Sequence, residues 1–131
     1  MSTLKMKSLI LTCVMLLTGS AWAEWVKVAE SDGGTIFYID DETIRKFGNM
    51  RLVWEIQNLP ARNKAGALSN RSRSEYDCTN ERYRMLSFSL HSGLMASGQN
   101  LMSIPVNLSE PWRDVPPDTS AETILKYVCA K

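Results

Sequence analysis

The C-terminal segment Thr119–Cys129, with the sequence TSAETILKYVC, constrains the fold more than any other part of this chain. Thr119 and Glu122, three residues apart, form a capping box that marks the start of a helix. The apolar side chains that follow have the spacing of one helical stripe: Ala121, Ile124, Leu125, Val128 and Cys129. We therefore predict a C-terminal helix whose apolar stripe lies on another element and ends in a cysteine.

Residues 1–23 have the pattern of a secretory signal peptide. Two lysines form a basic start, a short apolar run follows at Ser8–Leu17, and the sequence AWA ends at Ala23 as a small-x-small cleavage site. We predict that the chain is exported and cut between Ala23 and Glu24.

Two alternatives would keep the protein on a membrane. The apolar run could stay uncleaved as an anchor, although it is too short to span a bilayer. A lipid could be attached at Cys13, but Thr12 is a poor residue before a lipidated cysteine and little apolar sequence precedes it. A mature chain without a membrane span is the preferred prediction.

Cleavage would leave residues 24–131, a chain of 108 residues and one domain of ordinary size. The loss of Lys5 and Lys7 reduces the 15 basic residues to 13, against 14 acidic residues. A charge so near balance gives no reason to expect a nucleic acid or a membrane surface as the partner.

Cys78 and Cys129 are the two cysteines of the mature chain. Two cysteines in an exported protein favour one disulfide, with two buried free thiols as the alternative. A bridge between them would pin the helix to the rest of the domain. In the chain-entropy account it would stabilise the fold by about 4 kcal/mol.

The sequence between the cleavage site and the helix has the alternation of antiparallel strands. A short helix is also expected at Glu42–Lys46, ended by Gly48, and the extended segment Val106–Pro117 leads into the C-terminal helix. The predicted strands are Trp25–Ala29, Thr35–Ile39, Asn49–Asn58, Arg73–Cys78, Arg82–His91 and Asn100–Ile104. This order predicts one small α+β domain: an antiparallel sheet of about six strands, with the C-terminal helix packed on it and tethered by the disulfide.

The predicted core follows from the alternation within these strands. Leu52, Trp54 and Ile56 share one face of the third strand, and Glu55 shares the other face with Gln57. A sheet of this kind has one apolar face to cover, and the helix stripe is the long apolar surface that can cover it. We therefore assign Trp54 and Tyr76 to the core. Trp112, which lies between prolines, is expected at the sheet edge, with an exposed anchor for a partner as the alternative.

The candidate catalytic and metal-binding residues do not form a convincing site. His91 is the single histidine, and neither Ser89 nor Ser92 lies in a nucleophile elbow, so a hydrolase triad is disfavoured. The acidic run Asp40-Asp41-Glu42 lacks the spacing of a calcium loop, and capping of the short helix explains it better. We predict no catalytic residues, no metal site and no cofactor.

A basic loop is the best candidate for recognition. Ala61–Ser72 has neither helical nor strand periodicity and reads as a mobile loop. Four basic residues without a neighbouring acid lie in or beside it: Arg62, Lys64, Arg71 and Arg73. They could meet an acidic protein surface, and a merely solvated loop is the alternative.

Several linked motifs resemble the surface-adhesin protein E-like family over Glu24–Lys131. They are WVKVAESDGGTIFYID, the TIRKFGN segment, SEYDCTNERYRMLSFSLHSG and PWRDVPPDTSAETILKYVC. Within them, the Y-D-C motif ends at Cys78, R-Y-R spans Arg82–Arg84, and P-W…V-P-P precedes the helix that ends in Cys129. These motifs are specific in combination.

The resemblance implies an antiparallel sheet of about six strands and a C-terminal helix tethered by a Cys78–Cys129 disulfide. It also implies an exported, non-enzymatic envelope protein, since the namesake is a surface adhesin that binds host matrix and plasma proteins and can pair as a dimer. The expected partner is a host matrix protein or an envelope component, with a homodimer as a further expectation. This chain lacks the namesake's lipobox, which favours a soluble periplasmic structural or assembly protein as the alternative to a surface adhesin. In that role, the strand edge Asn100–Ile104 could pair with another chain.

Overall fold

The computed structural model describes residues 24–105 and 110–131. Residues 1–23 lie outside the described residues, and with them the predicted signal peptide, Cys13 and Ala23. Residues 106–109 of the expected extended segment also lie outside. The elements are β1 (Trp25–Glu30), β2 (Ile36–Asp40), the 3-10 helix η1 (Asp41–Thr43), β3 (Arg45–Phe47), β4 (Met50–Asn58), β5 (Ser69–Asp77), β6 (Arg82–His91), β7 (Asn100–Pro105), β8 (Arg113–Asp114) and α1 (Ser120–Cys129).

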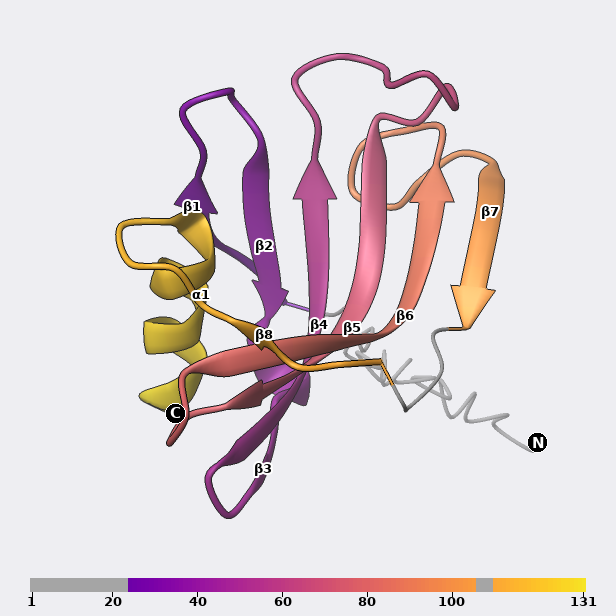
Figure 1. The fold of residues 1–131 in the computed structure, drawn as a ribbon. Coiled ribbons are helices and arrows are strands. Elements are labelled where there is room, and N and C mark those ends of the chain that lie inside the picture. The colour runs from indigo at the N-terminus through magenta and orange to yellow at the C-terminus, as the bar shows by residue number, and fades with distance from the viewer. Residues whose placement is uncertain (1–23, 106–109) are drawn as a thin grey trace, which may run out of the picture.

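The strands form one antiparallel sheet in the order β1-β2-β4-β5-β6-β7, with β3 added to β4 and β8 added to β6. A register shift between Arg73 and Ser74 interrupts the pairing of β5 with β6. Figure 1 shows both strands bending strongly, so that the start of β6 lies with β8 on the side of the helix. This agrees with the local twist that a bulge introduces into a strand pair. The predicted six-stranded sheet with a C-terminal helix is confirmed, and β3 and β8 are additions to it.

The helix stripe forms one half of the core. Ile124, Leu125 and Val128 are buried in one cluster with residues of the sheet, which are Ile39, Val53 and Tyr76. At the helix start, the Thr119 hydroxyl accepts a hydrogen bond from the Glu122 amide at 3.3 Å, as a capping box requires. The Glu122 carboxylate instead pairs with Lys126, one turn on.

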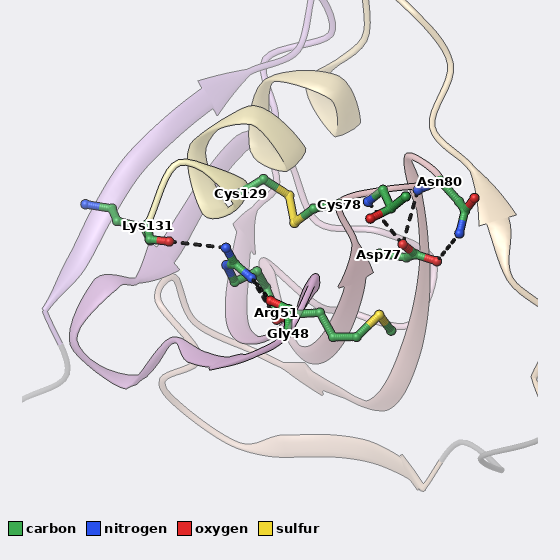
Figure 2. The surroundings of a disulfide bond; sticks show 9 residues. Gly48, Arg51, Asp77, Cys78, Asn80, Cys129 and Lys131 are labelled. Carbon is green, nitrogen blue, oxygen red and sulfur yellow. Dashed lines mark hydrogen bonds between the residues drawn. A yellow bond between two sulfur atoms is a disulfide. The ribbon is translucent and has the colours of Figure 1, made fainter.

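A disulfide and a hydrogen bond from Arg51 hold the end of the helix against the sheet. Cys78 and Cys129 are bonded, with 5.8 Å between their Cα atoms. Figure 2 shows Arg51 of β4 beside this bridge, where its guanidinium donates to the carbonyl oxygens of Gly48 (3.0 Å) and Lys131 (3.2 Å). The predicted disulfide is confirmed, and it closes a sequence separation of 51 residues.

The expected helix at Glu42–Lys46 is wrong. Only Asp41–Thr43 form a single 3-10 turn, and Arg45–Phe47 pair with β4 as the strand β3. Gly48 does not end a helix but occupies the tight turn between β3 and β4, with a φ of 57°. That left-handed conformation favours glycine in a hairpin turn as much as at a helix end, which is why the sequence signal was ambiguous.

Helix capping also fails as the explanation of the acidic run. Asp40 makes no side-chain capping bond to the 3-10 turn. Asp41 instead accepts a hydrogen bond from the Tyr127 hydroxyl at 2.7 Å and forms an ion pair with Lys131 at 3.0 Å. These two contacts hold the pKa of the Asp41 carboxyl below its ordinary value. The residue thus ties the end of the chain to the sheet.

The helix covers the face of β4 opposite to the one predicted. Val53 and Glu55 lie on the covered face, together with Ser72, Ser74 and Tyr76 of β5. Trp54 is on the other face and only half-buried, so its assignment to the core beneath the helix is wrong, whereas that of Tyr76 is confirmed. The reason is that Glu55 is accommodated by hydroxyl groups. Its carboxylate accepts hydrogen bonds from Ser74 at 2.9 Å, from Ser72 at 3.3 Å and from the Tyr76 hydroxyl.

The buried carboxyl of Glu55 predicts a pH dependence of stability. Burial raises the pKa of Glu55 above its ordinary value of 4.5, and the hydroxyl donors offset this only in part. A raised pKa in the folded state means that the neutral acid is favoured there. The neutral Glu55 carboxyl therefore contributes fully to the free energy of unfolding below about pH 4.5. This contribution is lost as the pH rises through the folded-state pKa of Glu55.

The Glu55→Gln variant removes this titration and nearly keeps the shape of the side chain. We expect its free energy of unfolding to depend less on pH than that of the wild type, and the difference to develop above pH 4.5. Urea unfolding at a series of pH values, with the exposed Glu30→Gln as the control, measures it. Parallel profiles for the wild type and Glu55→Gln would show that Glu55 titrates normally.

Candidate functional site: a basic and aromatic face of the sheet

The four basic residues predicted in or beside one loop fall into two separate groups. Strand β5 begins at Ser69, so Arg71 and Arg73 lie within a strand and not in a mobile loop. Arg62 and Lys64 remain in the connection between β4 and β5. The predicted loop boundary at Ser72 is therefore wrong.

Arg62 is an internal brace of this connection. Its guanidinium donates to the carbonyl oxygens of Gly66 at 3.0 Å and Ser92 at 2.6 Å. The Asn63 side chain also accepts hydrogen bonds from the amides of Ala65 and Ala67. Arg62 thus links two loops. Lys64, by contrast, is exposed, and its ammonium group makes no hydrogen bond or ion pair with the described residues.

Arg71 and Arg73 stack on Trp54, on the sheet face opposite the helix. The guanidinium carbon of Arg71 lies 4.2 Å from the Trp54 ring centroid, and that of Arg73 lies 5.3 Å away. The arrangement follows from the register, because Arg73 is directly opposite Trp54 and Arg71 is opposite Ile56. We call Trp54, Arg71 and Arg73 the arginine–tryptophan cluster.

The charges of this cluster are not balanced locally. No acidic side chain in residues 24–105 and 110–131 forms an ion pair with either arginine. The Nε atoms of both are buried without a hydrogen-bond partner, although each side chain as a whole is only half-buried. A guanidinium stacked on an aromatic ring is fixed in orientation and keeps its in-plane N–H groups for an incoming acceptor.

A shallow pocket of about 320 Å³ adjoins the cluster. Trp54 and Arg71 line one part of it, and three serines of neighbouring strands line another: Ser87, Ser89 and Ser103. These positions face each other because Ser89 pairs with Arg71 across β5 and β6, and with Ser103 across β6 and β7. The pocket is therefore built on paired strands.

A second pair of arginines stacks on Trp112, but its charges are balanced. Arg82 and Arg84 lie 4.7 and 4.4 Å from the Trp112 ring centroid. Arg82 forms an ion pair with Asp77 at 2.9 Å, and Arg84 forms one with Glu75 at 3.3 Å. Trp112 thus lies beside β6, just before β8, which agrees with the expected position at the sheet edge.

His91 and Ser89 are in contact without forming a catalytic triad. The Ser89 hydroxyl lies 2.8 Å from the His91 Nε2 atom. Within the part of the chain that the structure describes, no carboxylate hydrogen-bonds to the imidazole. Burial and then the positive charge of Arg71 lower the pKa of His91. A triad needs an acid that orients and stabilises the imidazolium, whereas the charged neighbour of His91 is a cation.

The described residues contain neither a cluster of metal-binding side chains nor a membrane-spanning helix. No three or more histidine, cysteine, aspartate or glutamate side chains there are grouped as a metal site would require. Among the same residues, no helix has the length and apolar character needed to cross a membrane.

The fold is similar to that of protein E from Haemophilus influenzae. The selenomethionine form of that protein superposes with a TM-score of 0.63 at 16% sequence identity, over 81% of this chain and 85% of the other. A second crystal form gives a TM-score of 0.59 at 17% identity, over 81% of this chain and 87% of the other. At these identities the likeness shows the fold alone.

Comparison at the sequence level gives the family. No curated protein matches the chain significantly. The model of the surface-adhesin protein E family matches residues 25–130, which is nearly all of the described part of the chain. This chain belongs to the surface-adhesin protein E family.

Proposed function

We propose that the protein is an exported, non-enzymatic envelope protein that binds an acidic surface of another protein through the arginine–tryptophan cluster. The observation that carries this proposal is the pair of stacked, uncompensated guanidinium groups of Arg71 and Arg73. Two fixed cations on strand β5, stacked on a tryptophan of the paired strand β4, form a rigid recognition surface, which keeps the entropy lost on binding small. Membership of a family named for a surface adhesin supports a protein partner.

The family name suggests that this partner lies on the surface of a host. Under this proposal the partner is a matrix or plasma protein, and the chain acts from the outside of the cell. The predicted signal peptide and the disulfide support export, since disulfides persist in oxidising compartments.

Neutralising the cluster should weaken partner binding, and neutralising the neighbouring loop should not. We expect the double variant Arg71→Gln/Arg73→Gln to lose about tenfold or more in affinity, because each charge-assisted hydrogen bond contributes about 1.5–3 kcal/mol. Surface plasmon resonance against a panel of purified extracellular matrix proteins measures this loss.

The matched control is Arg62→Gln/Lys64→Gln, which removes the same charge from the other half of the predicted basic set. Its affinity should stay close to that of the wild type. Loss of binding in this control alone would move the contact to the loop, and unchanged binding in both double variants would rule out all four residues.

A second candidate function is an assembly role in the periplasm through the edge of the sheet. Strand β7 ends the strand order, and three of its large apolar side chains are exposed: Leu101 at 39%, Met102 at 43% and Ile104 at 44%. An exposed apolar edge strand can pair with a strand of another chain or of a second copy.

Cell fractionation separates the two functions. A protein that is cleaved when intact cells are treated with external protease acts at the surface, as the adhesin proposal requires. A soluble periplasmic protein that is protected until the outer membrane is opened favours the assembly role. The mature mass from the same sample tests the predicted cleavage before Glu24.

A further inference from the structure

We propose that the pocket beside Arg71 binds a carboxylate-bearing sugar unit, such as a uronic acid at the end of an acidic glycan. The inference rests on the proposed function, since it names the group of the partner that the arginine–tryptophan cluster would recognise. It is carried by the guanidinium of Arg71, the serine hydroxyls around it and the size of the pocket.

Arg71 provides the site for the carboxylate. Its guanidinium is held on the Trp54 ring at 4.2 Å, and its buried Nε has no acceptor. A carboxylate can accept two parallel hydrogen bonds from one guanidinium, and arginine is well suited to this geometry. Such a ligand would neutralise a charge that no described acid pairs with.

The remainder of the pocket suits a sugar better than an acidic side chain of a protein. The Ser87 hydroxyl lines the pocket and makes no hydrogen bond within the described residues. Ile104 and Pro105 of β7 supply apolar surface next to it. A sugar acid combines one carboxylate, several hydroxyls and an apolar C–H face, so it matches all three parts of the lining.

The volume favours the same ligand. About 320 Å³ is near the lower end for small-molecule pockets, which range from about 300 to 1,000 Å³. A single aspartate or glutamate carboxylate would leave most of this space to water, whereas one sugar ring would use it.

The cluster at Trp112 provides an internal comparison. Arg82 and Arg84 stack on that ring in a similar way, but Asp77 and Glu75 already hold their guanidinium groups. An anionic ligand would have to displace a protein carboxylate there. We therefore expect the anion to bind at Trp54 and not at Trp112.

The experiment is a titration of the purified protein with glucuronate, followed by the NMR signals of the tryptophan indole N–H groups. Glucose is the matched ligand, since it carries a neutral hydroxymethyl group where glucuronate carries the carboxylate. We expect a saturable shift of the Trp54 signal with glucuronate, with a dissociation constant on the order of millimolar, as is usual for one ring held by a few polar contacts. Glucose should give no such shift.

Two variants locate the site. Arg71→Gln should weaken glucuronate binding about tenfold or more, because it removes a charge-assisted contact. Lys64→Gln removes the same charge from an exposed position outside the pocket and should bind as the wild type does. A shift of Trp112 alone, or equal binding by Arg71→Gln and the wild type, would overturn the proposal.

The sugar part and the proposed function can fail separately. If free glutamate binds as tightly as glucuronate, the site recognises a carboxylate and not a sugar, and the inference is wrong. If no sugar acid binds but Arg71→Gln still weakens matrix-protein binding, the inference fails and the proposed function stands. If glucuronate binds at Trp54 while matrix-protein binding is independent of Arg71, the inference stands and the proposed function fails.

Discussion

Replacing either Cys78 or Cys129 with serine is expected to lower the free energy of unfolding by roughly 2–5 kcal/mol, the usual cost of losing a native disulfide from a small exported domain. The bridge spans a sequence separation of 51 residues, so its loss frees much of the unfolded chain. It also releases the end of the helix that covers Ile39, Val53 and Tyr76. Many domains of this size are stable by only about 5–15 kcal/mol, so the loss is a large part of the total.

Urea unfolding followed by circular dichroism measures this loss. The double variant Cys78→Ser/Cys129→Ser should be about as stable as either single variant, because each of the three lacks the same single bridge. The wild type in a reducing buffer should approach the double variant. Equal midpoints for the reduced and oxidised wild type would mean that packing alone holds the helix.

The helix and its tether could be predicted from the sequence because each had a local signal. The stripe from Ala121 to Cys129 has one period throughout, and the cap at Thr119 marks where it begins. The bridge followed from having two cysteines in the mature chain. The antiparallel sheet was also predictable, because the strands alternate in polarity and consecutive strands are neighbours in most of the sheet.

The buried face of β4 could not be predicted, because several residues on this face of β4 and β5 are polar. Ser72 and Ser74 are 1% and 2% exposed, and Glu55 is buried at 8% exposure. A reading based on apolar alternation assigns such residues to solvent. Burial of the Glu55 carboxyl depends on three hydroxyl donors that are 17 to 21 residues away along the chain. No local sequence pattern indicates that these hydroxyl groups lie next to Glu55 in the fold.

The candidate site was missed as a cluster for the same reason. The start of β5, SNRSRSE, alternates small serines with long charged side chains, which is strand periodicity without apolar residues. This alternation of size was the signal that could have placed Arg71 and Arg73 on one face. Their contact with Trp54 needed the pairing of β4 with β5, which sequence reasoning had not assigned.

Replacing Leu125 with alanine is expected to destabilise the domain by roughly 2–5 kcal/mol, the range found for emptying a packed leucine site. Leu125 is 5% exposed and lies in one cluster with Ile39 and Val53, so the lost methyl groups would leave a cavity between the helix and the sheet. Urea unfolding measures the change. The control is Lys126→Ala, at the neighbouring exposed position, which raises helix propensity slightly and removes one surface ion pair.

Combining Leu125→Ala with the double cysteine variant tests whether the stabilisation from helix packing depends on the stabilisation from the disulfide. If the bridge acts only by restricting the unfolded chain, the two losses should add to within about 0.5 kcal/mol, as they do for independent sites. If the bridge also presses the helix onto the sheet, the losses should not add, because an untethered helix can move and fill the cavity. The second outcome is the one we expect, since Leu125 lies one turn before Cys129 on the same stripe. Strict additivity would assign the bridge an effect on the unfolded state alone.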